Sequence, residues 1–345
     1  MRLLSTTRAR VPIAVALCLA LSSAAFAAKA RILVPASLAA DLADVAKAHD
    51  VELVPAKPDE MAQKIADCDA VVGIGPGPKL AEILAAGKKL KWIQTSSAGA
   101  EEFVAIPDLV SSPVVLTNSK ILLGPGVADH AMALLLNLTR DMKWWNEQMK
   151  VGFVQKPRLP LIELQGKTAL VIGYGGIGHQ IAQRSAGFGM RVLAIDVVDV
   201  PPTRDVEYVG QPEDLDRLLP EADVVFVSVP FTKATQGMIG PKQFELMKKG
   251  AYLINVGRGG VVDTPALTAA LQSGKLAAAG LDVVEPEPLP ADHPLWSMQN
   301  VTISPHAAGQ MDGLRARQIE LYRDNIERYL TGKPMRNLVD KQKGF

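Results

Sequence analysis

Polar residues of three types follow strand-like apolar runs in the second half of the chain. Arg258, an acid at Glu285 or Glu287, and His306 each come just after the end of such a run. In open parallel sheets, ligands bind at the edge where the carboxyl ends of the strands meet. There, an arginine can hold a carboxylate with its planar fork, and a histidine can exchange a proton near neutral pH. Because a neighbouring carboxylate orients an imidazole, the three types together predict proton transfer on a bound carboxylic acid.

Each of these residues has an ordinary structural explanation when it is taken alone. Arg258 could form a surface salt bridge, and Glu287 could be a solvated loop acid. The other histidines lie in helical or loop stretches with no strand end to direct them, and we expect structural or solvent-facing roles for His49, His130, His179 and His293. We expect His130 in particular to face a helix interface. Since His306 follows a buried strand and opens into small residues, the combination favours a functional site.

A glycine-rich turn between a buried strand and a helix is typical of dinucleotide binding. The apolar run 168–172 leads into Gly173-Tyr174-Gly175-Gly176-Ile177-Gly178, and a helical stretch follows over 179–188. The first glycine allows the tight turn, the second lets a pyrophosphate approach the backbone, and the third lets the helix pack closely on the strand. The N–H groups at the helix start then face the phosphates. We therefore expect cofactor contacts at Gly173, Gly175, Gly176, Ile177 and Gly178.

An aspartate ends the next strand-like run, 191–195, about 20 residues after the glycine-rich turn. The carboxylate of Asp196 can accept hydrogen bonds from the ribose hydroxyls and would repel a 2′-phosphate. Residues 197–199 offer no arginine to bind such a phosphate, which favours NAD over NADP as the cofactor. Arg204 lies near enough in the sequence to keep NADP as the alternative.

Two regions of alternating apolar runs and helical stretches must position these residues. Such alternation predicts an α/β fold of βαβ units, with two Rossmann-like or flavodoxin-like parallel sheets. The expected strands are 31–34, 51–54, 70–73, 92–95, 168–172, 191–195, 252–256, 278–283 and 301–304. The expected helices are 38–47, 58–65, 79–86, 127–148, 179–188 and 311–330. We expect the helix over 127–148 to be one long connector between the two regions.

Length and charge narrow the class of protein. The chain has 345 residues, which favours two domains at roughly 150 residues each. Lysines and arginines number 37 and the acids 36, so we expect no basic surface that would bind nucleic acid through its phosphates. Apolar residues make up 48% of the chain, which is enough for two sizeable cores.

The first residues are typical of a secretory signal peptide. Arg2, Arg8 and Arg10 precede the uncharged run 11–27, which ends in an A-x-A cleavage pattern. The alternatives are a membrane anchor, for which the run falls short of the about 20 residues needed, a buried N-terminal helix, or a mis-assigned start. We expect residues 1–27 to be removed on export to the periplasm or the medium, with no membrane association afterwards. If the segment is not used, the protein stays in the cytoplasm.

Taken together, residues 90–335 resemble the D-isomer-specific 2-hydroxyacid dehydrogenase family. The motifs that carry this resemblance are Ser96-Ser97-Ala98-Gly99, Thr117-Asn118, Val127-Ala128-Asp129-His130, Gly173 to Gly178, Val229-Pro230-Phe231-Thr232 with Thr235, Asn255-Val256-Gly257-Arg258-Gly259, Leu281-Asp282-Val283 with Glu287-Pro288-Leu289-Pro290, and Pro305-His306. The resemblance implies a substrate domain built from both chain ends, 28–122 and 310–345, and an NAD-binding domain inserted at 123–309. It also implies a homodimer whose interface includes the connector helix after Pro125.

The resemblance assigns roles to individual residues and implies an activity. It makes Arg258 the carboxylate-binding residue, His306 the acid/base, and Glu287, which precedes the Pro-Leu pair, the partner of His306. The resemblance also implies that Ala98 and Gly99 bind the substrate through their backbone N–H groups. It implies that Asp282 faces the nicotinamide carboxamide. Further contacts with NAD are implied for Val229, Pro230, Thr235, Val256, Gly257 and Gly309. The implied activity is hydride transfer between NAD(H) and a D-2-hydroxy acid or 2-oxo acid, without a metal.

A few positions bear on the branch of the family. Asp129 stands where the family usually has glutamate, and Phe153 lies near where many members carry a tryptophan over the substrate. Formate dehydrogenases of the same fold have glutamine at the position of Glu287, so the acid argues against that branch. Two alternatives of another class are a corepressor-like protein that senses NAD(H) and an exported NAD-binding or scaffold protein without turnover.

Overall fold

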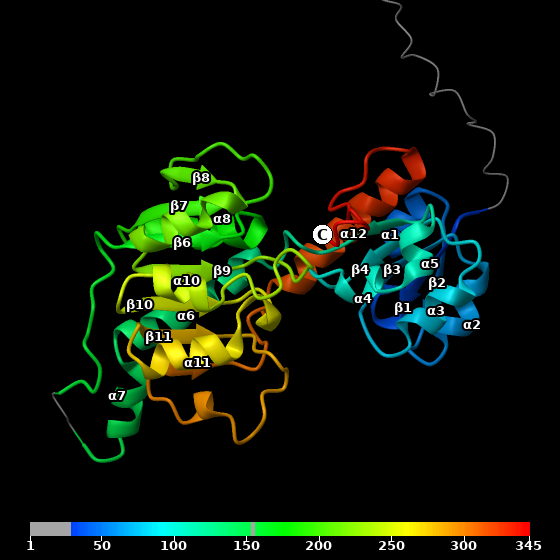
Figure 1. The fold of residues 1–345 in the computed structure, drawn as a ribbon. Coiled ribbons are helices and arrows are strands. Elements are labelled where there is room, and N and C mark those ends of the chain that lie inside the picture. Colours follow the sequence, from blue (N-terminus) through cyan, green and yellow to red (C-terminus); the bar gives the residue numbers. More distant parts are fainter. Residues whose placement is uncertain (1–28, 153–155) are drawn as a thin grey trace, which may run out of the picture.

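Five parallel strands form the first sheet of the computed structural model, which describes residues 29–152 and 156–345 (Figure 1). They lie in the order β2-β1-β3-β4-β5, with bounds β1 (Arg31–Pro35), β2 (Glu52–Ala56), β3 (Ala70–Ile74), β4 (Trp92–Thr95) and β5 (Val115–Thr117). The helices between them are α1 (Ala43–Ala48), α2 (Met61–Lys64), α3 (Leu80–Ala86), α4 (Glu101–Val104) and α5 (Pro107–Ser111). Ile32, Leu33 and Val34 have no exposed surface, as expected for a parallel sheet covered on both faces.

Seven parallel strands form the second sheet, in the order β12-β11-β10-β9-β6-β7-β8. The strands are β6 (Thr168–Ile172), β7 (Arg191–Ile195), β8 (Tyr208–Gly210), β9 (Val224–Val227), β10 (Ala251–Asn255), β11 (Leu276–Leu281) and β12 (Val301–Ile303). The helices are α6 (Gly124–Thr139), α7 (Met142–Gln148), α8 (Gly176–Gly187), α9 (Leu215–Leu218), α10 (Pro241–Leu246) and α11 (Thr264–Gln272). Chain order runs outward in opposite directions from the β6–β9 pair, which makes this pair the switch point where open α/β sheets bind ligands.

The last helix returns the chain to the first sheet. α12 (Leu314–Thr331) lies among the first-sheet elements in Figure 1, and its Leu321 and Tyr322 share a buried cluster with Trp92. We call the first sheet with its helices and α12 the first body, and the second sheet with α6 to α11 the second body. This return is what a domain built from both chain ends requires, while the boundaries at 122/123 and 309/310 stay predictions.

The helix expected over 127–148 is two helices, so that prediction is wrong at its centre. α6 ends before Arg140, and α7 starts after Asp141, whose φ of +50° lies in the left-handed region. Aspartate tolerates this conformation better than most residues. The buried Asp141 carboxylate accepts hydrogen bonds from the N–H groups of Arg158 (2.7 Å) and Leu159 (3.0 Å), which fixes the break to the following loop.

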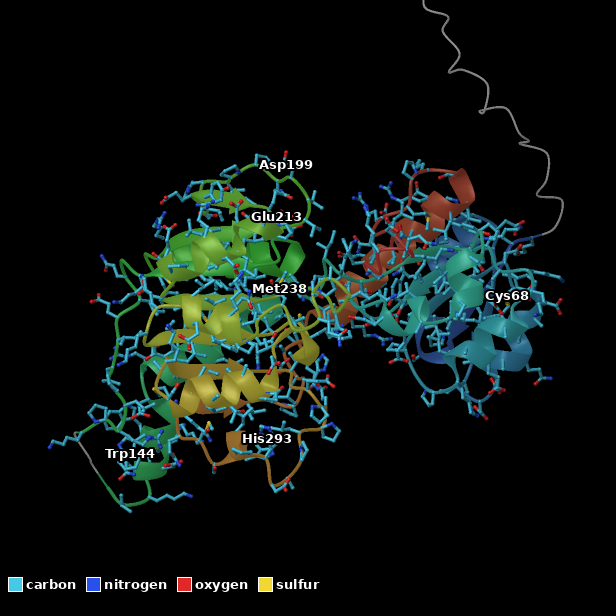
Figure 2. The ribbon with its side chains drawn as sticks, viewed as in Figure 1. Cys68, Trp144, Asp199, Glu213, Met238 and His293 are labelled. Carbon is cyan, nitrogen blue, oxygen red and sulfur yellow. The ribbon has the colours of Figure 1, made fainter. Side chains whose placement is uncertain are left out.

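Some sequence predictions fall outside the described residues. The signal peptide expected at residues 1–27 and the position of Phe153 are among those that the structure does not describe. Within 29–152 and 156–345, no helix is long and apolar enough to cross a membrane. Cys68, the free cysteine of these ranges, is buried in the first body (Figure 2).

Candidate active site

A cavity of about 380 Å³ is lined by residues of both bodies, near the carboxyl ends of β4, β6, β7, β9 and β10. The predicted site residues that line it are Ala98, Gly99, Gly173, Gly175, Gly176, Ile177, Asp196, Val229, Pro230, Thr235, Val256, Gly257 and Arg258. The predicted site residues outside its lining are Gly178, Asp282, Glu287, His306 and Gly309. The cavity therefore brings together the expected dinucleotide site and the expected carboxylate-binding residues.

The glycine-rich turn has the geometry that a bound pyrophosphate requires. Gly173 has a φ of +92°, so the chain turns sharply at the end of β6. A Cβ on Gly178 would lie 1.9 Å from the Gly173 carbonyl oxygen, whereas a Cβ on Gly175 would meet no atom within 4 Å. Gly178 thus permits close packing, and Gly175 leaves open space over the first turn of α8, which begins at Gly176. These residues fit the phosphates of a dinucleotide.

Asp196 is held rigidly at the carboxyl end of β7. Its Oδ2 accepts a hydrogen bond from the N–H of Tyr174 (2.7 Å), and its Oδ1 accepts one from the N–H of Val198 (2.9 Å). The side chain lines the cavity beside the glycine-rich turn. Each carboxylate oxygen has two lone pairs, so both keep capacity to accept hydrogen bonds from ribose hydroxyls.

Replacing Asp196 by serine should weaken the binding of NADH by about tenfold to a hundredfold, because a charged acceptor for the ribose hydroxyls is lost. Binding of NADPH should not weaken, since the same charge repels a 2′-phosphate. Fluorescence titration with each dinucleotide measures both constants. Asp199→Ser is the matched control, because Asp199 is an exposed acid in the following loop (Figure 2). An unchanged ratio of the two constants would contradict the role of Asp196.

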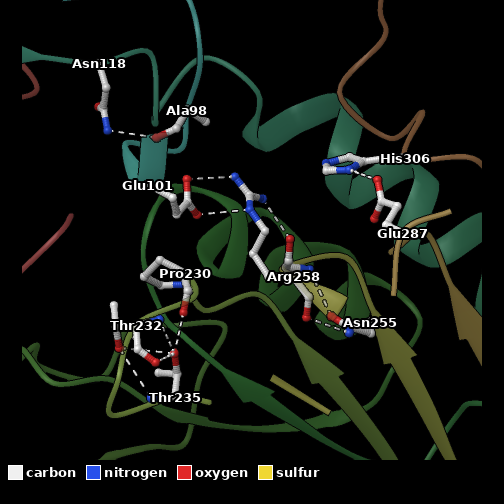
Figure 3. Close-up of polar contacts among 11 residues, drawn as sticks. Ala98, Glu101, Asn118, Pro230, Thr232, Thr235, Asn255, Arg258, Glu287 and His306 are labelled. Atoms are coloured by element: carbon white, nitrogen blue, oxygen red, sulfur yellow. Dashed lines mark hydrogen bonds and ion pairs between the residues drawn. The ribbon is translucent and has the colours of Figure 1, made fainter. Parts of the chain in front are cut away.

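The loops after β9 and β10 pack directly on one another beneath the cavity. A Cβ on Gly257 would lie 2.7 Å from the Val229 carbonyl oxygen, so only glycine fits there. The hydroxyl of Thr235 donates to the Pro230 carbonyl oxygen at 2.7 Å, which closes the loop after β9 (Figure 3). This packing places the expected NAD contacts of both loops along one wall of the cavity.

Arg258 extends from the loop after β10 towards the first body (Figure 3). Its Nη1 donates to the Gly257 carbonyl oxygen at 2.8 Å, and its own carbonyl oxygen accepts from the side-chain amide of Asn255 at 3.0 Å. Its guanidinium faces Glu101, with Nε 3.0 Å from Oε1. The guanidinium is thus anchored on one side and meets an acid on the other.

The loop after β4 supplies the opposite wall. The side-chain amide of Asn118 donates to the Ala98 carbonyl oxygen at 2.8 Å, which holds this loop in place (Figure 3). The N–H groups of Ala98 and Gly99 donate to no other described residue. They are therefore available to a ligand in the cavity, as the expected substrate role requires.

His306 and Glu287 form the predicted pair. The Nδ1–H of His306 donates to Oε1 of Glu287 at 2.7 Å, and both side chains are partly exposed (Figure 3). His306 follows β12 and Glu287 follows β11, which neighbours the strand β10 that precedes Arg258. Since Nε2 forms no hydrogen bond with a described residue, it is free to exchange a proton with a bound oxygen.

Asp282 builds the loop that carries His306. Its carboxylate accepts hydrogen bonds from the Ser304 hydroxyl (2.7 Å) and from the N–H groups of Ala307 (2.9 Å) and Ala308 (3.0 Å). The Asp282 carbonyl oxygen also accepts from the His306 N–H at 2.9 Å, and His306 has a left-handed φ of +52°. Asp282 is 2% exposed, and these hydrogen bonds show that it stabilises the loop. Its contact with the nicotinamide stays a prediction.

His130 also belongs to this loop, and the expectation that it faces a helix interface is wrong. It reaches from α6 to Ser304, with Nε2 2.7 Å from the hydroxyl oxygen and 3.4 Å from Oδ1 of Asp282. His179 has a structural contact, since its ring stacks on Tyr174 with the centroids 3.7 Å apart.

Several polar residues of the cavity lining were not predicted as site residues, among them Glu101, Asn118 and Lys120. Burial lowers the pKa of the Lys120 ammonium from its usual value, and Nζ donates to the Leu338 carbonyl oxygen at 3.2 Å. Glu101 pairs with Arg258, which lies 157 positions away in the sequence, and no local spacing reveals such a contact. Asn118 lies in a motif already noted, but its contact with Ala98 depends on the pairing of β4 with β5.

Comparison with known proteins identifies the family of the chain. The family model for the NAD binding domain of D-isomer specific 2-hydroxyacid dehydrogenases matches residues 132–308. The chain is 35% identical over 296 residues to the glyoxylate reductase of Korarchaeum cryptofilum. The aligned region covers 81% of this chain and 85% of the relative.

Solved structures extend the likeness to both bodies. A D-isomer specific 2-hydroxyacid dehydrogenase family protein from Aeromonas salmonicida matches with a TM-score of 0.76 and 30% identity, over 91% of this chain and 100% of that one. D-lactate dehydrogenase from Aquifex aeolicus, complexed with NAD and lactic acid, matches with a TM-score of 0.72 and 29% identity, over 90% and 99% of the two chains. The chain belongs to the D-isomer specific 2-hydroxyacid dehydrogenase family of NAD(P)-dependent oxidoreductases.

Proposed function

We propose that the protein reduces a small 2-oxo acid to the D-2-hydroxy acid with NADH, and catalyses the reverse oxidation. The observation that carries this proposal is the placement of Arg258, Glu287 and His306 after three neighbouring strands, β10, β11 and β12. The name of the relative from Korarchaeum cryptofilum supports glyoxylate as one candidate substrate. The name of the Aquifex aeolicus structure supports pyruvate as another.

In this mechanism, Arg258 binds the substrate carboxylate together with the N–H groups of Ala98 and Gly99. The glycine-rich turn and Asp196 would hold NADH, which when bound would supply the hydride to the carbonyl carbon. His306, protonated on both ring nitrogens, gives its Nε2 proton to the carbonyl oxygen. The carboxylate of Glu287 accepts a hydrogen bond from Nδ1–H, so it fixes the ring orientation and stabilises the imidazolium.

A substrate panel tests the proposal. NADH oxidation should occur with one or more of glyoxylate, hydroxypyruvate, pyruvate, phenylpyruvate and 2-oxoisocaproate. Chiral chromatography of a product such as lactate should then show the D isomer. An NAD-binding scaffold or corepressor-like protein would bind NADH, yet none of the five acids would accelerate its oxidation. That outcome, or an L product, would refute the proposal.

Replacing Asp282 by asparagine should lower kcat by about tenfold to a hundredfold, because the loop that places His306 loses one carboxylate acceptor and His306 shifts. Asp263→Ala is the matched control. Asp263 caps α11 by accepting the Ala266 N–H at 2.8 Å, so its loss should cost about 0.5–2 kcal/mol of folding stability without lowering kcat. Steady-state kinetics and thermal unfolding of both variants separate the two effects. A normal kcat in Asp282→Asn would rule out the loop-positioning role.

The homodimer is also a proposal, and α7 supports it. Met142, Met149 and Val151 are 45%, 78% and 75% exposed, and Trp144 lies at the far side of the second body from the first (Figure 2). Exposed apolar side chains on α7 and just after its end favour association with a second protein surface. Light scattering coupled to size-exclusion chromatography should give twice the chain mass, and a monomer would refute the dimer.

Export is proposed from the N-terminal sequence alone. A charged start, an apolar run and a small-residue cleavage pattern support removal of residues 1–27. Free NAD is scarce outside the cytoplasm, so an exported enzyme must retain its cofactor or acquire it locally. N-terminal sequencing of fractionated protein tests this proposal, since an intact Met1 in the cytosol would contradict it.

A further inference from the structure

Arg258 and Glu101 form an ion pair that joins the two bodies. Nε of Arg258 lies 3.0 Å from Oε1 of Glu101, and Nη2 donates a hydrogen bond to Oε2 at 3.4 Å (Figure 3). Glu101 begins α4 in the first body, and Arg258 follows β10 in the second. Both oxygens of the carboxylate face the planar guanidinium, as the carboxylate of a bound acid would.

The ion pair lies directly against the expected substrate loop. A Cβ on Gly99 would come within 2.1 Å of Oε2 of Glu101 and 2.2 Å of Nη2 of Arg258. The N–H groups of Ala98 and Gly99, which donate to no described residue, belong to the same loop. Glu101 therefore places a carboxylate beside both the guanidinium and this loop, where the proposed function requires the carboxylate of the substrate.

The contact between the two side chains is incomplete. Oε1 of Glu101 is buried but accepts no hydrogen bond from a described residue, although Nε of Arg258 is close, because the N–H is poorly directed at it. The side chains of Arg258 and Glu101 are 32% and 29% exposed. A partly exposed ion pair contributes little free energy, and a buried acceptor left without a donor is unfavourable. The Glu101 carboxylate is thus suited to displacement by a carboxylate with better geometry.

We propose that Glu101 is an internal competitor for Arg258 that sets the affinity for substrate carboxylates. The proposal rests on the proposed function, because it assigns this place to a 2-oxo acid. The incoming acid must break the ion pair before it forms its own bidentate contact with Arg258. Once the acid is bound, the displaced Glu101 carboxylate stays close to the substrate carboxylate, and the repulsion between the two charges lowers the affinity further.

A purely positioning role for Glu101 predicts the opposite effect. If Glu101 held the guanidinium in its binding orientation, removing the charge would free Arg258 to turn, and KM for the oxo acid would rise. Glutamine keeps the length and volume of the side chain, so Glu101→Gln removes the charge with little change in packing. The direction of the change in KM therefore separates competition from positioning.

The test compares Glu101→Gln with Glu102→Gln, the adjacent acid. Glu102 instead accepts a hydrogen bond from the Gly77 N–H at 2.9 Å, which makes it a matched control. Glu101→Gln should lower KM for the 2-oxo acid that the enzyme reduces by about fivefold. It should lower the Kd of oxamate for the NADH-bound enzyme by the same factor. Glu102→Gln should leave both constants within about twofold of the wild type. Steady-state kinetics gives KM, and titration calorimetry gives the Kd of oxamate.

A double mutant shows whether the gain depends on Arg258. In the Arg258→Ala background, Glu101→Gln should no longer improve oxamate binding fivefold, because no guanidinium remains to be released. An unchanged or higher KM in Glu101→Gln, or the same gain without Arg258, would overturn the inference. If the wild type neither reduces a 2-oxo acid nor binds oxamate, the proposed function fails and this inference with it. If it does both while Glu101→Gln binds no tighter, only the inference fails.

Discussion

Replacing His306 by asparagine should lower kcat for 2-oxo acid reduction by about two to four orders of magnitude, because the group that protonates the carbonyl oxygen is lost. Asparagine is preferable to alanine here, since the φ of His306 is +52° and asparagine tolerates left-handed backbone. The fold and the cofactor site should therefore survive the substitution. Stopped-flow measurement of NADH oxidation gives the rate, and fluorescence titration shows whether NADH still binds.

His293→Asn is the matched control for this prediction. His293 lies in the loop between β11 and β12 of the same body, where its Nδ1 accepts the Leu295 N–H (Figure 2). Asparagine can replace it as a helix cap, so kcat should stay within about twofold of the wild type. If His306→Asn turned over as fast as this control, His306 would not be the acid/base.

Replacing Arg258 by alanine should lower kcat/KM for the oxo acid by about two to four orders of magnitude. The guanidinium can make two charge-assisted hydrogen bonds to a carboxylate, and each contributes about 1.5–3 kcal/mol. Arg258→Lys should fall between the wild type and alanine, because lysine keeps the charge but not the planar fork. NADH binding should persist in both variants, which distinguishes loss of the substrate contact from loss of the fold.

Arg204→Ala is the control for charge. The Arg204 side chain is 98% exposed on the second body, so its removal changes the net charge by the same amount without touching the cavity lining. kcat/KM should stay within about twofold of the wild type. A similar loss in Arg204→Ala and Arg258→Ala would point to long-range attraction rather than to a specific carboxylate contact.

Much of the fold could be predicted from the sequence because its strands are buried on both faces. Each expected strand is present, with ends that differ by at most two residues, as in β11 (Leu276–Leu281) against the expected 278–283. The strands β5, β8 and β9 were not predicted; β5 and β8 have three residues each and β9 has four, and such short apolar runs carry little periodic signal. The break at Asp141 was also missed, since its cause is a contact with residues 158 and 159, beyond the reach of helical periodicity.

The candidate site divides in the same way. The glycine-rich turn and Asp196 depend on local geometry. The sequence pattern of strand, turn and helix therefore predicts them. The pairing of His306 with Glu287 required the resemblance to a family to choose between Glu285 and Glu287, and the structure has the His306–Glu287 contact. The contact of Glu101 with Arg258 joins the two bodies, and the loop-building contacts of Asp282 join the ends of the neighbouring strands β11 and β12. Such contacts depend on tertiary packing, which spacing along one chain does not encode.

An isotopic label can be followed from NADH into the product to show hydride transfer by the protein. The purified protein is mixed with the 2-oxo acid that it reduces fastest and with NADH in which deuterium replaces both hydrogens at C4 of the nicotinamide. Mass spectrometry should find one deuterium at C2 of the hydroxy acid, formed at a rate that falls by about two to four orders of magnitude in His306→Asn. A product without deuterium at C2, or equal rates of label transfer in His306→Asn and the wild type, would contradict the account.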